Sequence, residues 1–121
     1  MPPRTLFTVA GAANLLVAVA LVVPGSPLWS MLGMAPPRET AFLQLFALLV
    51  GVFGLAYLWI ARDLSGKRAL IQVAVAGKLS VVTTSVVQWV AGAVPGGVPL
   101  AFAGDVVFAL LFLQILRRHP G

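Results

Sequence analysis

Residues 71–90 have the sequence IQVAVAGKLSVVTTSVVQWV, a run apolar enough to cross a membrane that nevertheless holds Lys78 near its middle. A helix needs about 20 predominantly apolar residues to cross the hydrocarbon core of a bilayer. A lone ammonium at the centre of such a helix costs roughly 2.5–3.5 kcal/mol on insertion scales. The stretch therefore predicts a membrane-spanning helix whose lysine needs a partner from another part of the chain.

The composition of the whole chain is that of an integral membrane protein. Hydrophobic residues make up 60% of its 121 residues and charged residues 9%, against about 45–50% and 25% in soluble domains. The mean hydropathy is +1.04. The length is that of one domain. Although the net charge is +5, the basic residues form no patch interleaved with aromatic residues, so we predict contact with the lipid bilayer and no nucleic-acid partner.

The scarcity of reactive residue types excludes several chemistries. The chain has no cysteine, which removes disulfides, thiolate metal sites and thiol nucleophiles. Its only histidine is His119, close to the C-terminus, so one chain cannot build a bis-histidine haem site or a histidine metal site. We predict no metal, no cofactor and no catalytic residue.

Four apolar runs, each bounded by proline, glycine or clustered charges, predict four membrane spans. These are residues 5–23, 40–61, 69–91 and 98–116. The first is longer than the 7–15 apolar residues typical of a signal peptide, which favours a retained span. After it, Ser26 and Pro27 are a helix-start signal before a short apolar run that ends at Pro36. The expected fold class is all-α: an integral membrane four-helix bundle with a short interfacial helix in the first outer loop.

The distribution of basic residues predicts the orientation of the spans. Cytoplasmic loops are enriched in lysine and arginine. The side opposite the termini has only Arg38, beside Glu39. The side shared by both termini and the middle loop has Arg4, Arg62, Lys67, Arg68, Arg117 and Arg118. We therefore expect both termini in the cytoplasm and, since the composition suits a high-GC bacterium, a location in the bacterial inner membrane.

Aromatic residues near the predicted span ends are typical of interfacial belts. We assign to such belts Tyr57 and Trp59 on the cytoplasmic side, and Trp29 and Trp89 on the outer side.

Three polar side chains from three spans are predicted to lie at one depth. At about 1.5 Å per residue from the nearest cytoplasmic charge, Lys78 and Asn14 lie about 15 Å deep and Asp105 about 18 Å. Small residues share their helical faces, as expected where membrane helices approach closely. We predict that Lys78 pairs with Asp105, with Asn14 as hydrogen-bond donor and acceptor, in a buried polar layer.

Further residues are candidates for the same site or a neighbouring one. The second span has two glycines that leave space for helix contact or for a ligand, and the third has a serine on the lysine face. A weaker polar level lies nearer the outside, although its threonines are also able to bond to their own helix. The additional ligand-binding or relay candidates are Gly51, Gly54 and Ser85, and those of the secondary level are Gln44, Gln88 and Thr84.

Two short motifs resemble a known family. The Gly77–Lys78 pair in the third span and the GDVVF motif, Gly104–Phe108, in the fourth are similar to those of small bacterial four-span proteins of the DoxX-like group. DoxX-like proteins usually have a Gly-x-x-Lys-like element in the first span, where this chain has Asn14. The resemblance implies a link to respiratory or redox-stress membrane complexes. Small multidrug exporters and fluoride channels are similar in length, but the former have a glutamate at the level of Asn14 and the latter are commonly inserted in both orientations.

Three classes of function compete with a purely structural clasp. The first is binding of a small lipophilic ligand, such as a quinone or isoprenoid, or of a partner membrane protein. The second is a transporter or channel protomer that acts as a homo-oligomer, with Lys78 and Asp105 as a proton or ion relay. The third is a membrane enzyme with Asp105 as general acid or base, which no nucleophile, metal site or phosphate-binding loop supports. We favour the first class.

Overall fold

A computed structural model of the chain describes residues 1–118, which are mainly helical; His119 lies outside the described residues. Four segments are long and apolar enough to cross a membrane, the fourth being formed by α5 and α6 together. A short helix, α2, lies between the first two. The predicted all-α bundle is therefore confirmed. The helices are α1 (Pro3–Val22), α2 (Leu28–Leu32), α3 (Thr40–Arg62), α4 (Arg68–Val90), α5 (Gly97–Ala101) and α6 (Ala103–Arg118).

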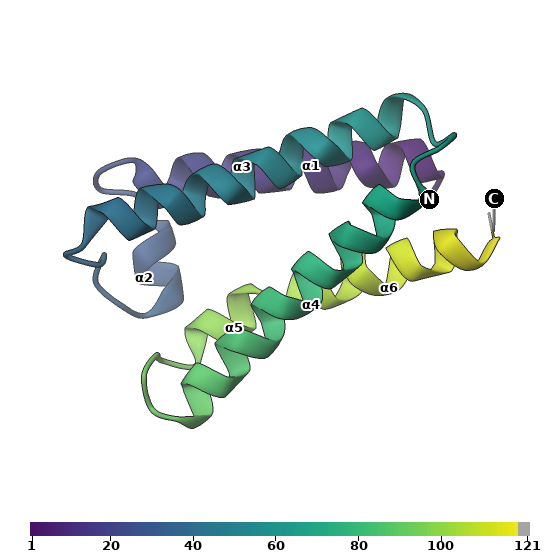
Figure 1. Cartoon of the computed structure of the whole chain (residues 1–121). Coiled ribbons are helices and arrows are strands. Elements are labelled where there is room, and N and C mark those ends of the chain that lie inside the picture. Colours follow the sequence, from purple (N-terminus) through teal and green to yellow (C-terminus); the bar gives the residue numbers. More distant parts are fainter. Residues whose placement is uncertain (119–121) are drawn as a thin grey trace.

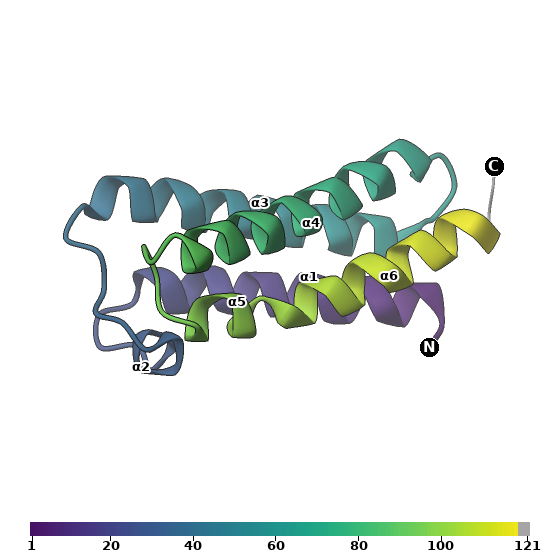
Figure 2. The ribbon, with the colours of Figure 1, turned by 90° about the horizontal axis from the view of Figure 1, so that it is seen from below.

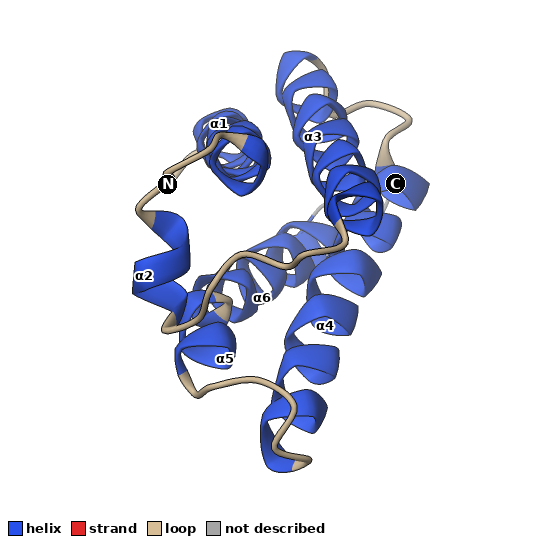
Figure 3. Cartoon of the chain, turned by 90° about the vertical axis from the view of Figure 1, so that its left-hand side faces the viewer, coloured by secondary structure: helices blue, strands red, loops and turns tan. Residues whose placement is uncertain are grey.

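The long helices form two antiparallel pairs, α1 with α3 and α4 with α6. The pairs meet at the end that holds the N-terminus, the α3–α4 loop and the end of α6, and they diverge toward α2 and α5 (Figure 1). Viewed from below, α4 lies in front of α3, and α5 and α6 lie in front of α1 (Figure 2). The end view shows α2 between α1 and α5, where it closes one side of the open end (Figure 3).

The fourth span is interrupted, which the sequence analysis did not foresee. Phe102 separates α5 from α6 and has φ −89° and ψ 2°. The Asp105 amide bonds to the Phe102 carbonyl, 3.0 Å away and only three residues earlier. Such a tight turn joins two helices without the regular α-helical ladder. As a result, Asp105 lies in the first turn of α6.

Two glycines allow α1 and α3 to pack closely. A Cβ atom added to Gly11 would lie 2.8 Å from the carbonyl oxygen of Gly54, and one added to Gly54 would lie 3.0 Å from that of Gly11. Small residues at such crossings let membrane helices approach closely. Gly51 faces the same helix, since its Cβ would lie 3.6 Å from the Ala18 Cβ. Both glycines predicted in the second span therefore contact α1.

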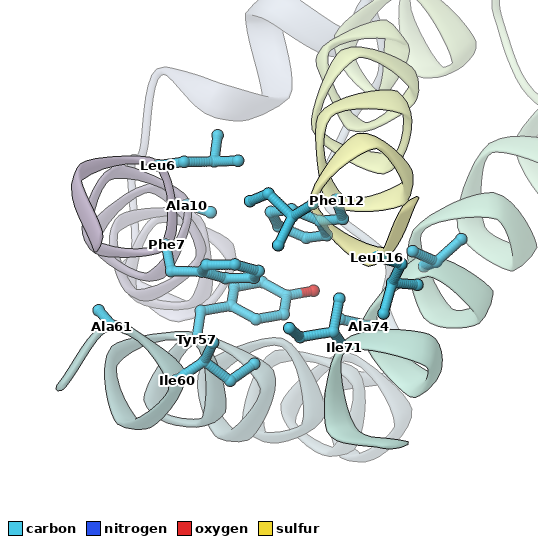
Figure 4. Packing of buried hydrophobic residues seen from close by; sticks show 12 residues of the cluster. Leu6, Phe7, Ala10, Tyr57, Ile60, Ala61, Ile71, Ala74, Phe112 and Leu116 are labelled. Carbon is cyan, nitrogen blue, oxygen red and sulfur yellow. The ribbon is translucent and has the colours of Figure 1, made fainter. Parts of the chain in front are cut away.

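An apolar core with stacked aromatic rings joins the two helix pairs at the charged end (Figure 4). The rings of Phe7 and Phe112 stack with centroids 4.5 Å apart, and Tyr57 meets Phe112 edge-on at 5.5 Å. Ile71 and Ala74 add the α4 surface. Each of the four long helices contributes to this cluster, so it holds the V-shaped arrangement together at its closed end.

The assignment of four aromatic residues to interfacial belts is wrong for two of them. Tyr57 is 2% exposed and Trp29 is also buried. Tyr57 shares a face of α3 with Gly54 and Ala61, which directs it into the bundle. Trp29 packs in the second core cluster with Leu21 and other buried residues. Trp59 and Trp89 are exposed, as a belt position requires.

The outward faces of the bundle suit a lipid environment. Large apolar side chains are exposed along α3, as expected where the surrounding medium is hydrocarbon. They include Phe42, Leu45, Leu48, Val52 and Leu55.

We expect Gly11→Ala to lower the free energy of unfolding by about 1–3 kcal/mol, because its methyl group would clash with the α3 backbone. The matched control is Gly104→Ala, since a Cβ there has nothing within 4 Å. The control should be neutral or slightly stabilising. Reversible unfolding in mixed micelles measures both, and equal stability of the two variants would contradict the proposed close contact.

Candidate functional site

The centre of the bundle holds an ion pair between α4 and α6. Lys78 Nζ lies 2.8 Å from Asp105 Oδ1 and also donates to Asn14 Oδ1 at 3.3 Å. The Lys78 side chain is 4% exposed and that of Asp105 is 23% exposed. The predicted pairing of the buried lysine with an aspartate at its own depth is thereby confirmed, and Asn14 joins the two on α1.

The local helix geometry favours each member of this layer. Lys78 follows Ala74 and Val75 along the buried stripe of α4, so its stem is covered by the neighbouring helices. Asp105 lies in the first turn of α6, where the positive end of the helix dipole stabilises a carboxylate. The interruption at Phe102 creates that helix start within the span. A break in the helix thus helps to stabilise the buried anion.

Asn14 connects the ion pair to the other pair of helices. Its Nδ2 atom donates to the Val50 carbonyl on α3 at 3.1 Å, while its Oδ1 atom accepts from Lys78. An amide offers both a donor and an acceptor, and Asn14 uses one of each across two interfaces. Through it, the layer links α1, α3, α4 and α6.

Two aromatic rings flank the ammonium. Lys78 Nζ lies 5.2 Å from the ring centroid of Tyr57 and 5.2 Å from that of Phe108. A cation at such a distance over an aromatic face is attracted by the ring quadrupole. Sequence reasoning missed both contacts. The spacing of Phe108, three residues after Asp105 in the GDVVF motif, was a usable signal, since residues at i and i+3 share a helix face.

A cavity of about 270 Å³ adjoins the layer and is lined by residues from every helix. Lys78, Asp105, Asn14 and Tyr57 form its polar part. The rest of the wall consists of Gly77 and of the apolar residues Val17, Leu21, Leu28, Leu32, Phe46, Leu49, Val50, Phe53, Val81, Ala101 and Phe102. The polar layer therefore borders this cavity and is not fully enclosed by packed side chains.

The other predicted site residues lie outside this cavity wall. Ser85 is buried and donates to the Val82 carbonyl of its own helix at 2.8 Å. Gln44, Gln88 and Thr84 are exposed. Gly51 and Gly54 lie at the α1–α3 contact, as described above. Within residues 1–118, no group of three or more histidine, aspartate or glutamate side chains is arranged to hold a metal ion.

A double-mutant cycle measures the strength of the ion pair. We expect Lys78→Met and Asp105→Leu each to lower the free energy of unfolding by roughly 3 kcal/mol, because each leaves an unpaired charge in the membrane interior. The double variant should lose less than the sum, with a coupling of about 1 kcal/mol or more. Unfolding in mixed micelles is the measurement. Additive losses would mean that the two groups do not stabilise each other.

Comparisons with protein-family models, with curated proteins and with solved structures found no match to this chain.

Proposed function

We propose that the protein binds a small lipophilic molecule within the membrane, with the polar head of the ligand at the Lys78–Asp105–Asn14 layer and its apolar part in the adjoining cavity. The observation that carries this proposal is the cavity of about 270 Å³, which is apolar except at that layer. Ligand sites in proteins are typically apolar clefts with a few polar groups that fix orientation.

The charges at the polar end favour a neutral head group. Lys78 and Asp105 neutralise each other, so an ionised head would enter the membrane interior without a counter-charge, which is costly. An ammonium has three N–H donors, and Lys78 uses two of them on Asp105 and Asn14. A carbonyl or hydroxyl group suits the third. A quinone or an isoprenoid alcohol has such a head attached to an apolar body.

The shape of the cavity favours binding over passage. The aromatic cluster of Phe7, Tyr57 and Phe112 lies between the layer and the charged end of the bundle, and its rings are in contact. A ligand that enters beside the layer meets a packed core beyond it. This supports a binding role over the transporter or channel alternative, which needs a continuous path.

A side opening would give a lipophilic ligand access from the bilayer. Leu49 lines the cavity and is 59% exposed. It lies one turn from Phe53, which approaches Gly77 of α4 closely. An opening beside Leu49 would lie on the side of α3 that faces α4. Molecules dissolved in the bilayer reach such a site without crossing water.

Cavity filling tests the proposal. Decylubiquinone and farnesol are the probes, added to the purified full chain in detergent, and the melting temperature and the saturation of binding are measured. We expect at least one probe to bind and stabilise the native chain but not the Val81→Trp variant, because the larger side chain fills the cavity. Val87→Trp is the matched control, since Val87 lies on the same helix but is exposed outside the bundle.

The control should bind the probe as the native chain does. If neither probe binds to the native chain, or if Val81→Trp folds cooperatively and binds as well as Val87→Trp, the proposal is refuted.

The preference for a neutral head is tested by Asp105→Asn. This change leaves the Lys78 ammonium without a counter-charge, so the cavity should then favour an anion. Decanol and decanoate differ only in the head group. We expect the native chain to prefer decanol and the variant to shift the ratio of the two affinities toward decanoate by about tenfold, a change of roughly 1.4 kcal/mol. An unchanged ratio would show that the head group does not reach the ion pair.

A further inference from the structure

We infer that the groove between α4 and α6 at the charged end of the bundle binds the head group of an anionic phospholipid. The groove encloses about 440 Å³. It shares no lining residue with the cavity beside Lys78, so this site stands apart from the proposed function. Its lining residues are Arg68, Gln72 and Val75 of α4, and Leu113, Leu116 and Arg117 of α6.

The charge at this end of the molecule is strongly positive. Its basic side chains are those of both termini and of the α3–α4 loop, and its single acidic residue is Asp63. The Asp63 carboxylate accepts hydrogen bonds from the amide and hydroxyl of Ser65 in its own loop. Among residues 1–118, no carboxylate forms a salt bridge with Arg117. Juxtamembrane basic groups attract anionic lipids by about 1 kcal/mol each.

Arg68 is held in place across the groove. Its Nη1 atom donates to the Leu116 carbonyl on α6 at 2.8 Å. This bond joins the start of α4 to the end of α6 and holds the guanidinium in the groove that Arg117 also lines. Two arginines on facing helices suit a phosphate, because a planar guanidinium presents several N–H donors to its oxygens.

The order of chemical groups along the groove matches the order in a phospholipid. At 1.5 Å per residue, Gln72 lies about 6 Å and Val75 about 10 Å farther into the bundle than Arg68. Leu113 lies one turn inward from Arg117 on α6. Beyond the groove the same stripes continue with exposed apolar side chains, Leu79 on α4 and Leu110 on α6.

In a bound phospholipid, the phosphate would thus meet the two arginines, the ester groups would meet the Gln72 amide, and the acyl chains would meet the apolar side chains. The apolar lining residues Val75, Leu113 and Leu116 favour a phospholipid over free phosphate, because free phosphate would leave these side chains uncovered.

The test uses the purified full chain in dodecylmaltoside with short-chain lipids as probes. Binding of dioctanoyl phosphatidylglycerol and of dioctanoyl phosphatidylcholine is measured by native mass spectrometry, with inorganic phosphate as a competitor. We expect phosphatidylglycerol to bind at least about fivefold more tightly than phosphatidylcholine, as one or more charge contacts imply. Millimolar phosphate should not displace it.

The matched variants are Arg117→Gln and Arg118→Gln. Each removes one charge from the end of α6, but only Arg117 lines the groove. We expect the first to weaken binding of phosphatidylglycerol by about fivefold and the second by less than twofold. Equal losses in both variants, equal affinity for the two lipids, or displacement by phosphate would each overturn the inference.

Discussion

The bond between the Lys78 ammonium and the Asp105 carboxylate is the constraint on which the remaining structure depends. Either charge alone at the centre of a membrane span is costly, and together they lie 2.8 Å apart. The requirement that they meet fixes both the rotation and the relative height of α4 and α6. Asn14 then transmits this constraint to the other helix pair through the Val50 carbonyl.

The same residues that hold the fold together also form the polar end of the cavity. An ion pair with a purely structural role is best fully enclosed by apolar side chains, because a low dielectric constant strengthens the attraction between its charges. Here Asp105 is 23% exposed and lines a space whose other walls are largely apolar. The divergence of the two helix pairs toward α2 and α5 creates that space (Figure 1). The groups that stabilise the fold are therefore the same ones that would contact a ligand at the proposed site.

Depth along the membrane could be predicted from the sequence, whereas the direction of side chains could be predicted only in part. Counting from the charged ends brought Lys78 and Asp105 to one level, and the cost of a lone charge required them to meet. The same counting placed Gln44 and Gln88 together, yet both are exposed, because the helix pairs have separated at that end. Tyr57 was misassigned because an aromatic near a span end suits a belt as well as a core. The break at Phe102 has no proline or glycine at the position where it occurs.

The cross-links within each helix pair determine where the molecule is able to deform. Bonds at two levels join α4 to α6, Lys78 to Asp105 and Arg68 to the Leu116 carbonyl. The close glycine contact and the Asn14–Val50 bond join α1 to α3. The two pairs are linked by the aromatic core, by the Lys78–Asn14 bond, which at 3.3 Å is the longest in the layer, and at the open end by α2, which contacts α5. Because each pair is internally tied and a second buried cluster joins α1, α2, α3 and α5, the cavity is enclosed by contacts between the pairs on both sides of its polar layer.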